Sequence, residues 1–77
     1  MKIKVYAVLK EYFKPEFELK EGMLSLADLK EELIKLNPDA VKLINLSRFA
    51  INDTFINPDH HFYGDENISI IPPSSGG

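Results

Sequence analysis

The residues best suited to chemistry stand at the C-terminal end, which reads Pro72-Pro73-Ser74-Ser75-Gly76-Gly77. Gly76 and Gly77 lack a β-carbon, so they can enter a narrow channel and adopt backbone angles closed to other residues. At average glycine usage, two terminal glycines occur by chance in about 0.5% of chains. The pattern is typical of a chain end that works inside a partner's active site.

The two prolines set the direction and reach of this end. Proline fixes φ and directs the chain away from a sheet, and residues 74–77 then extend at most ~14 Å further. The alternatives are an expression remnant and an inert end. The stiff Pro72-Pro73 pair, directly after the last apolar strand, argues against both. We therefore expect a single domain with a globular body of residues 1–71 and a flexible, extended tail of residues 72–77.

The reactive group of this tail is the Gly77 carboxylate. Attack on ATP would convert it to an acyl-adenylate, and sulfide or a persulfide would then displace AMP and leave a thiocarboxylate, a good sulfur nucleophile. The chain has no cysteine, so it offers no thiolate, persulfide or disulfide of its own. It also lacks a G-x-x-x-x-G-K phosphate loop. We therefore expect no cofactor on this chain and activation of Gly77 in trans, with ATP held by another enzyme.

Other chemistry-bearing residues do not complete a site. His60 and His61 are adjacent beside Asp59, and a metal site there is conceivable, but nothing else supplies further ligands. Solvated loop histidines are the favoured interpretation, and no metal is predicted. Four acidic residues are expected on solvated faces and turns rather than in a paired-carboxylate site: Glu31, Glu32, Asp65 and Glu66.

Composition narrows the class of protein. The chain has 77 residues, 44% of them hydrophobic, and a net charge of −3, as in an ordinary small globular domain. Its basic residues are scattered, which argues against nucleic acid as the main partner. No apolar stretch approaches the length of a membrane span, and no secretory leader pattern follows Met1. We expect a cytoplasmic protein that does not bind membranes.

Two strands and a helix are predicted in the first half of the chain. Lys2–Lys10 and Pro15–Lys20 alternate with the period of a strand, joined by a hairpin through residues 11–14. Ser25 and Asp28 have the spacing of a helix capping box. An apolar stripe then follows, with a favourable Glu31–Lys35 pair beside it. The stripe consists of Leu26, Leu29, Leu33 and Leu36.

The second half predicts a short helical turn and three more strands. Pro38 should end the helix, and Asn37 can cap a second turn with Pro38 at its first position. Strands are expected over Ser47–Asn52, Phe55–Ile56 and Ile68–Ile71, with tight turns at 53–54 and 64–65. The order predicts an α+β ubiquitin-like β-grasp fold. It consists of a mixed sheet of four to five strands with one main helix across one face.

Strand parity predicts a patch for a partner. If Ile3, Val5, Ala7 and Leu9 face the helix, the alternate side chains point to the other side of the sheet. Ile71 is likewise turned outward if Ile68 and Ile70 take the core positions. The first and last strands are neighbours in a β-grasp sheet. A partner interface is therefore expected from Tyr6, Val8 and Ile71, edged by Lys10.

Three segments resemble the small subunit of molybdopterin synthase, the MoaD family. They are the opening Val5-Tyr6-Ala7-Val8-Leu9-Lys10-Glu11, the central Ala50-Ile51-Asn52, and the closing Gly64-Asp65-Glu66 with Ile70-Ile71-Pro72-Pro73-Ser74-Ser75-Gly76-Gly77. The Pro-Pro-x-x-Gly-Gly ending is the most specific of these. Lys10 departs from the family's usual arginine, and arginine alone offers a bidentate contact.

The resemblance implies a sulfur-carrying role. A ubiquitin-activating-like adenylyltransferase (MoeB-like) would adenylate Gly77, and a cysteine desulfurase or rhodanese would supply sulfur. The tail, Pro72 to Gly77, would enter the large synthase subunit (MoaE-like) of a heterotetramer. There it would donate sulfur to cyclic pyranopterin monophosphate to form the molybdopterin dithiolene. By itself the chain would be no enzyme.

Three other functions remain open. A thiamine-pathway sulfur carrier shares the fold and the Gly-Gly end, although such proteins generally lack the Pro72-Pro73 pair. A ubiquitin-like modifier, joined to lysines through Gly77, would use the same activated glycine. A plain binding module with an inert tail is the third.

Overall fold

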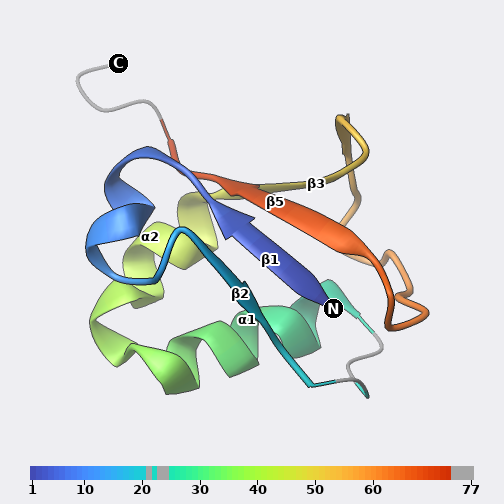
Figure 1. The fold of residues 1–77 in the computed structure, drawn as a ribbon, viewed down its shortest axis with the longest axis horizontal. Coiled ribbons are helices and arrows are strands. Elements are labelled where there is room, and N and C mark those ends of the chain that lie inside the picture. The colour runs from blue at the N-terminus through green and yellow to red at the C-terminus, as the bar shows by residue number, and fades with distance from the viewer. Residues whose placement is uncertain (21, 23–24, 74–77) are drawn as a thin grey trace.

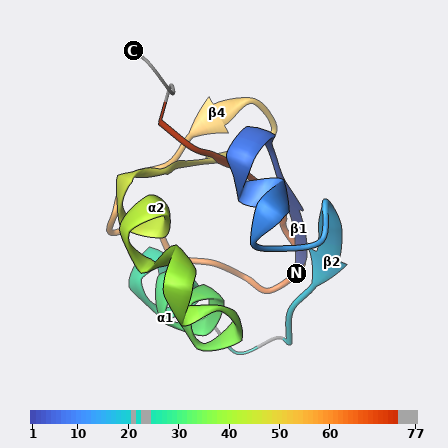
Figure 2. The same ribbon diagram turned by 90° about the vertical axis from the view of Figure 1, so that its left-hand side faces the viewer.

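The protein folds as one five-stranded sheet with its helices on one face. The structure, a computed structural model, describes residues 1–20, 22 and 25–73. Its strands are β1 (Lys2–Val5), β2 (Glu16–Glu18), β3 (Arg48–Ile51), β4 (Thr54–Phe55) and β5 (Asn67–Ile71), in the order β2-β1-β5-β3-β4. Figures 1 and 2 show α1 (Leu26–Leu36) and α2 (Val41–Leu46) together on one side of this sheet.

The strand pairing confirms the predicted mixed sheet. β1 runs parallel to β5, with Val5 opposite Ile70, and the other three pairings are antiparallel. The first and last strands are therefore neighbours, as predicted. The predicted α+β ubiquitin-like β-grasp fold is correct.

The predicted first strand is wrong beyond Val5. Ala7 has a φ of 52°, and a 3-10 helix, η1 (Ala7–Glu11), replaces the second half of the predicted strand. Leu9 is fully buried, whereas Ala7 is exposed. Val5, Leu9 and Phe13 are four residues apart, and the Phe13 N–H donates to the Leu9 carbonyl. Leu9 and Phe13 both belong to the core, so burial of these two side chains favours the helical turn over the strand that the alternation predicts.

The main helix has the predicted start. The Ser25 hydroxyl accepts a hydrogen bond of 3.3 Å from the Asp28 N–H, which caps α1. Leu26, Leu29 and Leu33 are buried, but Leu36 is 57% exposed and lies outside the core. The charged pair also differs from the predicted one, because Lys35 lies 3.5 Å from Glu32 rather than pairing with Glu31.

Two short helical segments, the 3-10 helix η2 (Pro38–Ala40) and α2, connect α1 to β3. The Asn37 side chain accepts a hydrogen bond from the Asp39 N–H and caps η2, as predicted. The helical segment continues further than predicted, as α2. Between β3 and β4, Asn52 and Asp53 both have positive φ, as a two-residue hairpin turn requires. That turn comes one residue earlier than predicted, so β4 begins at Thr54.

The core lies between the sheet and the helices. Its largest fully buried side chains come from β1, β5, η1, α1 and α2: Ile3, Val5, Leu9, Leu29, Leu33, Ile44, Ile68 and Ile70. Burial of Ile68 and Ile70, with Ile71 only half-buried, confirms the predicted parity of the last strand. The opposite face of the sheet carries no helix in the part of the chain that the structure describes (Figure 2).

Candidate functional site: the end of β5 and the outer face of the sheet

The C-terminal tail leaves from the end of β5. That strand ends at Ile71, Pro72 is half-buried and Pro73 is exposed. The remaining predicted tail residues, Ser74, Ser75, Gly76 and Gly77, lie outside the described residues, so the boundary between body and tail stays a prediction.

Side chains from four strands meet on the outer face of the sheet, the face turned away from the helices. In the strand register, Lys4 stands opposite Ser69, Ser69 opposite Ala50, and Ala50 opposite Phe55. The neighbouring row contains Ile71 opposite Arg48. Because side chains alternate along a strand, these residues share one side of the sheet.

A shallow groove of ≈ 420 Å³ runs across this outer face. It is lined by Tyr6, Ala50, Asp53, Phe55, Ser69 and Ile71. Tyr6 and Ile71, two of the predicted interface residues, therefore lie on one surface, and Ile71 is the last residue before the prolines. We call these six residues the outer groove.

The other two predicted interface residues lie elsewhere. Val8 and Lys10 belong to η1 and do not line the outer groove. Their prediction as interface residues assumes that the strand alternation of β1 continues past Val5. The positive φ of Ala7 ends that alternation. Lys10 is exposed and Val8 is half-buried.

Two cations cover aromatic rings of the outer groove. The Arg48 guanidinium carbon lies 3.6 Å from the centre of the Phe55 ring, and the Lys4 Nζ lies 5.4 Å from the centre of the Tyr6 ring. Such contacts hold a ring in place while leaving the charge in solvent. The outer groove therefore combines apolar side chains with basic groups beside it, Arg48 and Lys4, and one acidic group, Asp53, and it offers both contact area and charge to a docking protein.

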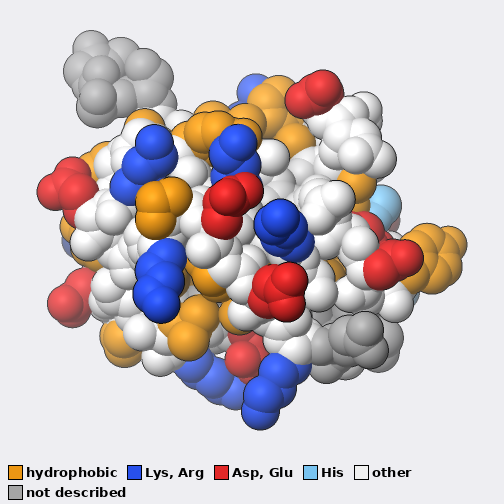
Figure 3. Space-filling view, in the orientation of Figure 1, with side chains coloured by type: hydrophobic (Ala, Val, Ile, Leu, Met, Phe, Trp, Pro, Cys, Tyr) orange, Lys and Arg blue, Asp and Glu red, His pale blue; other side chains and the backbone are white. Residues whose placement is uncertain are grey.

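Charges of both signs are mixed on the side of the molecule that has β1 and β2 in front in Figure 1. Figure 3 shows Lys and Arg side chains interspersed with Asp and Glu, without a large patch of one sign. This arrangement agrees with the scattered basic residues of the sequence.

Comparison with known proteins determines the family. The profile of the ThiS family matches residues 3–77, nearly the whole chain. This protein belongs to the ThiS family. Its structure is similar to the crystal structure of SAMP1 from Haloferax volcanii, with a TM-score of 0.74 and 16% sequence identity over 99% of this chain and 97% of that one. At that identity the likeness supports the fold alone. A search of curated proteins gave no match.

The Gly64-Asp65-Glu66 segment of this ThiS-family protein forms a tight, carboxylate-held turn. The two carboxylate oxygens of Glu66 accept hydrogen bonds from the Tyr63 N–H at 2.7 Å and the Gly64 N–H at 2.8 Å. Gly64 has a φ of 113°, which only glycine adopts without strain. Burial opposes ionisation of Glu66, but these hydrogen bonds and the nearby His60 outweigh it and lower the pKa of Glu66. The turn fixes the entry to β5, and β5 leads to the tail.

Replacing this carboxylate is expected to weaken the fold in a pH-dependent way. Glu66→Gln should lower the free energy of unfolding by about 1 kcal/mol at pH 7, because the charge-assisted hydrogen bonds weaken. Since folding lowers the pKa of Glu66 from its ordinary 4.5, its contribution is present above pH 4.5 and is lost as the pH falls through the folded-state value. Urea unfolding at several pH values checks this: the two proteins should converge in acid. A constant difference would contradict the assigned role.

The two histidines make different local contacts in the same loop region, and His61 is exposed. The His60 ring lies 5.4 Å from the Phe62 ring, and His61 forms an isolated bridge with Ser25. Within residues 1–20, 22 and 25–73, no group of three or more His, Cys, Asp or Glu side chains is placed to hold a metal. In the same residues, no helix is long and apolar enough to cross a membrane.

Sequence reasoning missed part of the outer groove. Ala50, Asp53, Phe55 and Ser69 were not predicted to face a partner, nor was Arg48 beside them. A usable signal was present, because a two-residue turn at Asn52-Asp53 pairs Ala50 with Phe55 and places both on one face. The predicted turn at residues 53–54 instead pairs Phe55 with Asn52, so it does not make Ala50 and Phe55 cross-strand neighbours.

Proposed function

We propose that this ThiS-family protein is a sulfur carrier that works through the carboxylate of Gly77. An adenylyltransferase activates Gly77 with ATP, a cysteine desulfurase or rhodanese provides sulfur, and the resulting thiocarboxylate donates it inside an acceptor enzyme. The observation that carries the proposal is the Gly76-Gly77 end in a chain without cysteine, placed behind Pro72-Pro73 at the end of β5. Membership of the ThiS family supports it.

We further propose that the acceptor enzyme is molybdopterin synthase. This chain would be its small subunit, and the thiocarboxylate would convert cyclic pyranopterin monophosphate to the dithiolene of molybdopterin. Pro72-Pro73 and the likeness of the opening, central and closing segments to the MoaD family support this assignment over a thiamine-pathway carrier. The prolines give the tail a stiff base, which reduces the ordering cost of inserting it into the large subunit.

The outer groove is the proposed docking surface for the large subunit. Tyr6, Phe55 and Ile71 present apolar area, and Arg48 and Lys4 supply charge at its edges. Ile71 belongs to the groove and also precedes Pro72, so docking would fix the direction in which the tail leaves. Lys10, exposed on η1, would contact the partner only at the edge of this surface.

The second candidate function is a ubiquitin-like modifier attached to lysines of other proteins. The ubiquitin-like β-grasp fold and the Gly76-Gly77 end would serve this candidate as well as the carrier. Activation of Gly77 is common to both functions, and they differ in the acceptor. Isopeptide-linked conjugates recovered from cells would identify the modifier, and a thiolated small-molecule product would identify the carrier.

A gene deletion tests the proposed pathway. A strain without this protein should lose molybdoenzyme activity and regain it when the wild-type gene is returned, while growing without thiamine. Restoration by a copy that ends at Gly76 would contradict the role of Gly77. Thiamine auxotrophy with intact molybdoenzymes would assign the protein to the thiamine pathway instead.

A further inference from the structure

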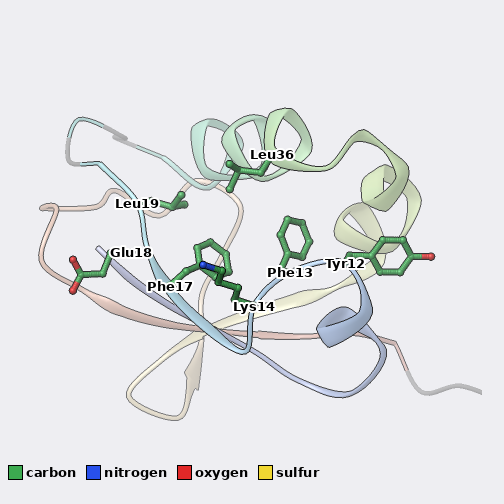
Figure 4. Close-up of a pocket in the computed structure, with 7 residues that line it drawn as sticks. All are labelled: Tyr12, Phe13, Lys14, Phe17, Glu18, Leu19 and Leu36. Carbon is green, nitrogen blue, oxygen red and sulfur yellow. The ribbon is translucent and has the colours of Figure 1, made fainter.

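The open edge of β2 borders a second apolar groove, on the other side of the sheet from the outer groove. This edge groove, ≈ 320 Å³ in volume, is lined by Tyr12, Phe13, Lys14, Phe17, Glu18, Leu19 and Leu36. Figure 4 shows Phe17 and Leu19 directed toward α1, with Leu36 reaching down from the helix and Glu18 pointing away. The exposure of Leu36, 57%, leaves an apolar side chain of α1 beside the groove without core packing.

The main chain of β2 is free to accept another strand. The Val5 N–H donates to the Pro15 carbonyl and the Leu19 N–H to the Met1 carbonyl, so alternate residues of β2 bond to β1. The N–H and carbonyl groups of Glu16 and Glu18, which lie between them, therefore point away from β1. β2 is the first strand of the sheet order, and no described strand pairs with that side.

The charges along β2 indicate which strand fits there. On the paired side, β1 places Lys2 opposite Glu18, Ile3 opposite Phe17 and Lys4 opposite Glu16. Among the described residues, neither Glu16 nor Glu18 has a basic group within 4 Å, so both carboxylates remain available. A strand on the open side would meet the same alternation, with basic side chains beside the glutamates and apolar side chains toward the edge groove.

A second copy of the chain fits this edge poorly. Antiparallel pairing of two β2 strands about Phe17 would place Glu16 of one copy opposite Glu18 of the other, and like charges directly opposite are destabilising. The other sheet edge, β4, has only two residues. A short edge strand of this kind discourages pairing.

From these observations we propose that β2 docks an extended segment of a partner protein in which basic and apolar residues alternate, with the apolar side chains in the edge groove. The segment adds a strand to the sheet and uses main-chain hydrogen bonds for affinity and the two glutamates for selectivity. Because β2 stands beyond β1, this docking leaves the outer groove and Pro72 accessible. The inference is independent of the sulfur-carrier proposal, and one partner could bind here while another acts on the tail.

A synthetic heptapeptide, acetyl-Lys-Val-Lys-Leu-Lys-Val-Lys-amide, serves as the probe for the full-length protein. In an NMR titration, the amide signals of Glu16, Phe17 and Glu18 should shift saturably. A peptide with glutamate in place of each lysine should bind at least about fivefold more weakly, the effect of the two cross-strand charge pairs that Glu16 and Glu18 offer. Glu16→Lys with Glu18→Lys should reverse that preference.

Two matched variants separate main-chain pairing from charge. Glu18→Pro removes the outward N–H, whereas the β1-facing hydrogen bond of Leu19 remains; it should weaken binding about fivefold more than Glu18→Gln, which keeps that N–H. Leu36→Asp should also weaken binding, because it places a charge among the apolar side chains of the edge groove.

Thermal unfolding verifies that each variant is folded. Shifts confined to the outer groove, equal binding of both peptides, or concentration-dependent dimerisation through β2 would overturn the proposal.

Discussion

One residue added after Gly77, or Gly77 deleted, is expected to abolish sulfur transfer completely while thermal unfolding stays nearly unchanged. The reacting group is the terminal carboxylate, so an added residue moves it beyond the position at which the activating enzyme presents ATP. Deletion shortens the tail by one residue, roughly 3.3–3.6 Å, and leaves the reacting atom short of the same position. A misplacement of the reacting atom by about 1 Å already lowers the rate of a well-aligned reaction about 10²-fold.

Two controls distinguish this effect from general damage to the tail. Ser74→Ala changes a tail side chain and leaves the length intact, so transfer should persist. Inserting one residue between Pro73 and Ser74 moves the carboxylate by the same length as the terminal addition, but keeps Gly76-Gly77 at the end. Strong loss in both length variants with normal Ser74→Ala activity is the expected pattern. Normal sulfur transfer by the protein extended beyond Gly77 would contradict the proposed working group.

Charge placed in the outer groove is expected to disrupt docking to the large synthase subunit. Ile71→Asp, Tyr6→Asp and Phe55→Asp should each weaken binding by about 30-fold or more, because each buries a carboxylate at the centre of the interface. Phe55 is the cleanest site, since it is 47% exposed in the free protein and lies outside the core. Isothermal titration with the purified large subunit measures the affinity.

A matched surface variant controls for the added charge. Leu46→Asp introduces the same group at an apolar side chain that is 66% exposed on α2, on the helical side of the sheet. It should bind the large subunit like the wild type. Equal loss from Leu46→Asp, or unchanged binding by Ile71→Asp and Phe55→Asp together, would move the interface away from the outer groove. If Ile71→Asp alone fails to fold, the binding affinity of Phe55→Asp decides whether the outer groove is the interface.

Much of the fold follows from local patterns in the sequence. The α1 cap at Ser25, the helix end before Pro38 and the parity of Ile68 and Ile70 each rest on residues close together in the chain. Apolar residues that alternate along a strand, or recur every three or four residues along a helix, are then buried. Their burial determines which face of the strand or helix turns toward the core. These features were predicted correctly because local preference and tertiary packing agree.

The end of β1 could not be read in the same way. Lys2–Lys10 alternates like a strand, yet the strand ends at Val5, and Leu9 and Phe13 reach the core from the 3-10 turn and the residues after it. The outer groove needed a further step, because it depends on the register between β3, β4 and β5. A hairpin turn misplaced by one residue pairs Phe55 with Asn52 instead of Ala50, so the predicted register does not bring Phe55 beside Ala50 and Ser69. Tyr6 was nevertheless assigned to the correct surface, one residue past the end of β1.

The carrier chemistry itself is tested most directly by the intact mass of the protein after reaction. Purified protein is incubated with its adenylyltransferase, ATP and a sulfur donor, and the product is fragmented to locate any change. The expected product has one oxygen replaced by sulfur, in the terminal residue Gly77, and it forms only when ATP is present. A protein of unchanged mass, or a modification located in any other residue, would contradict the sulfur-carrier function.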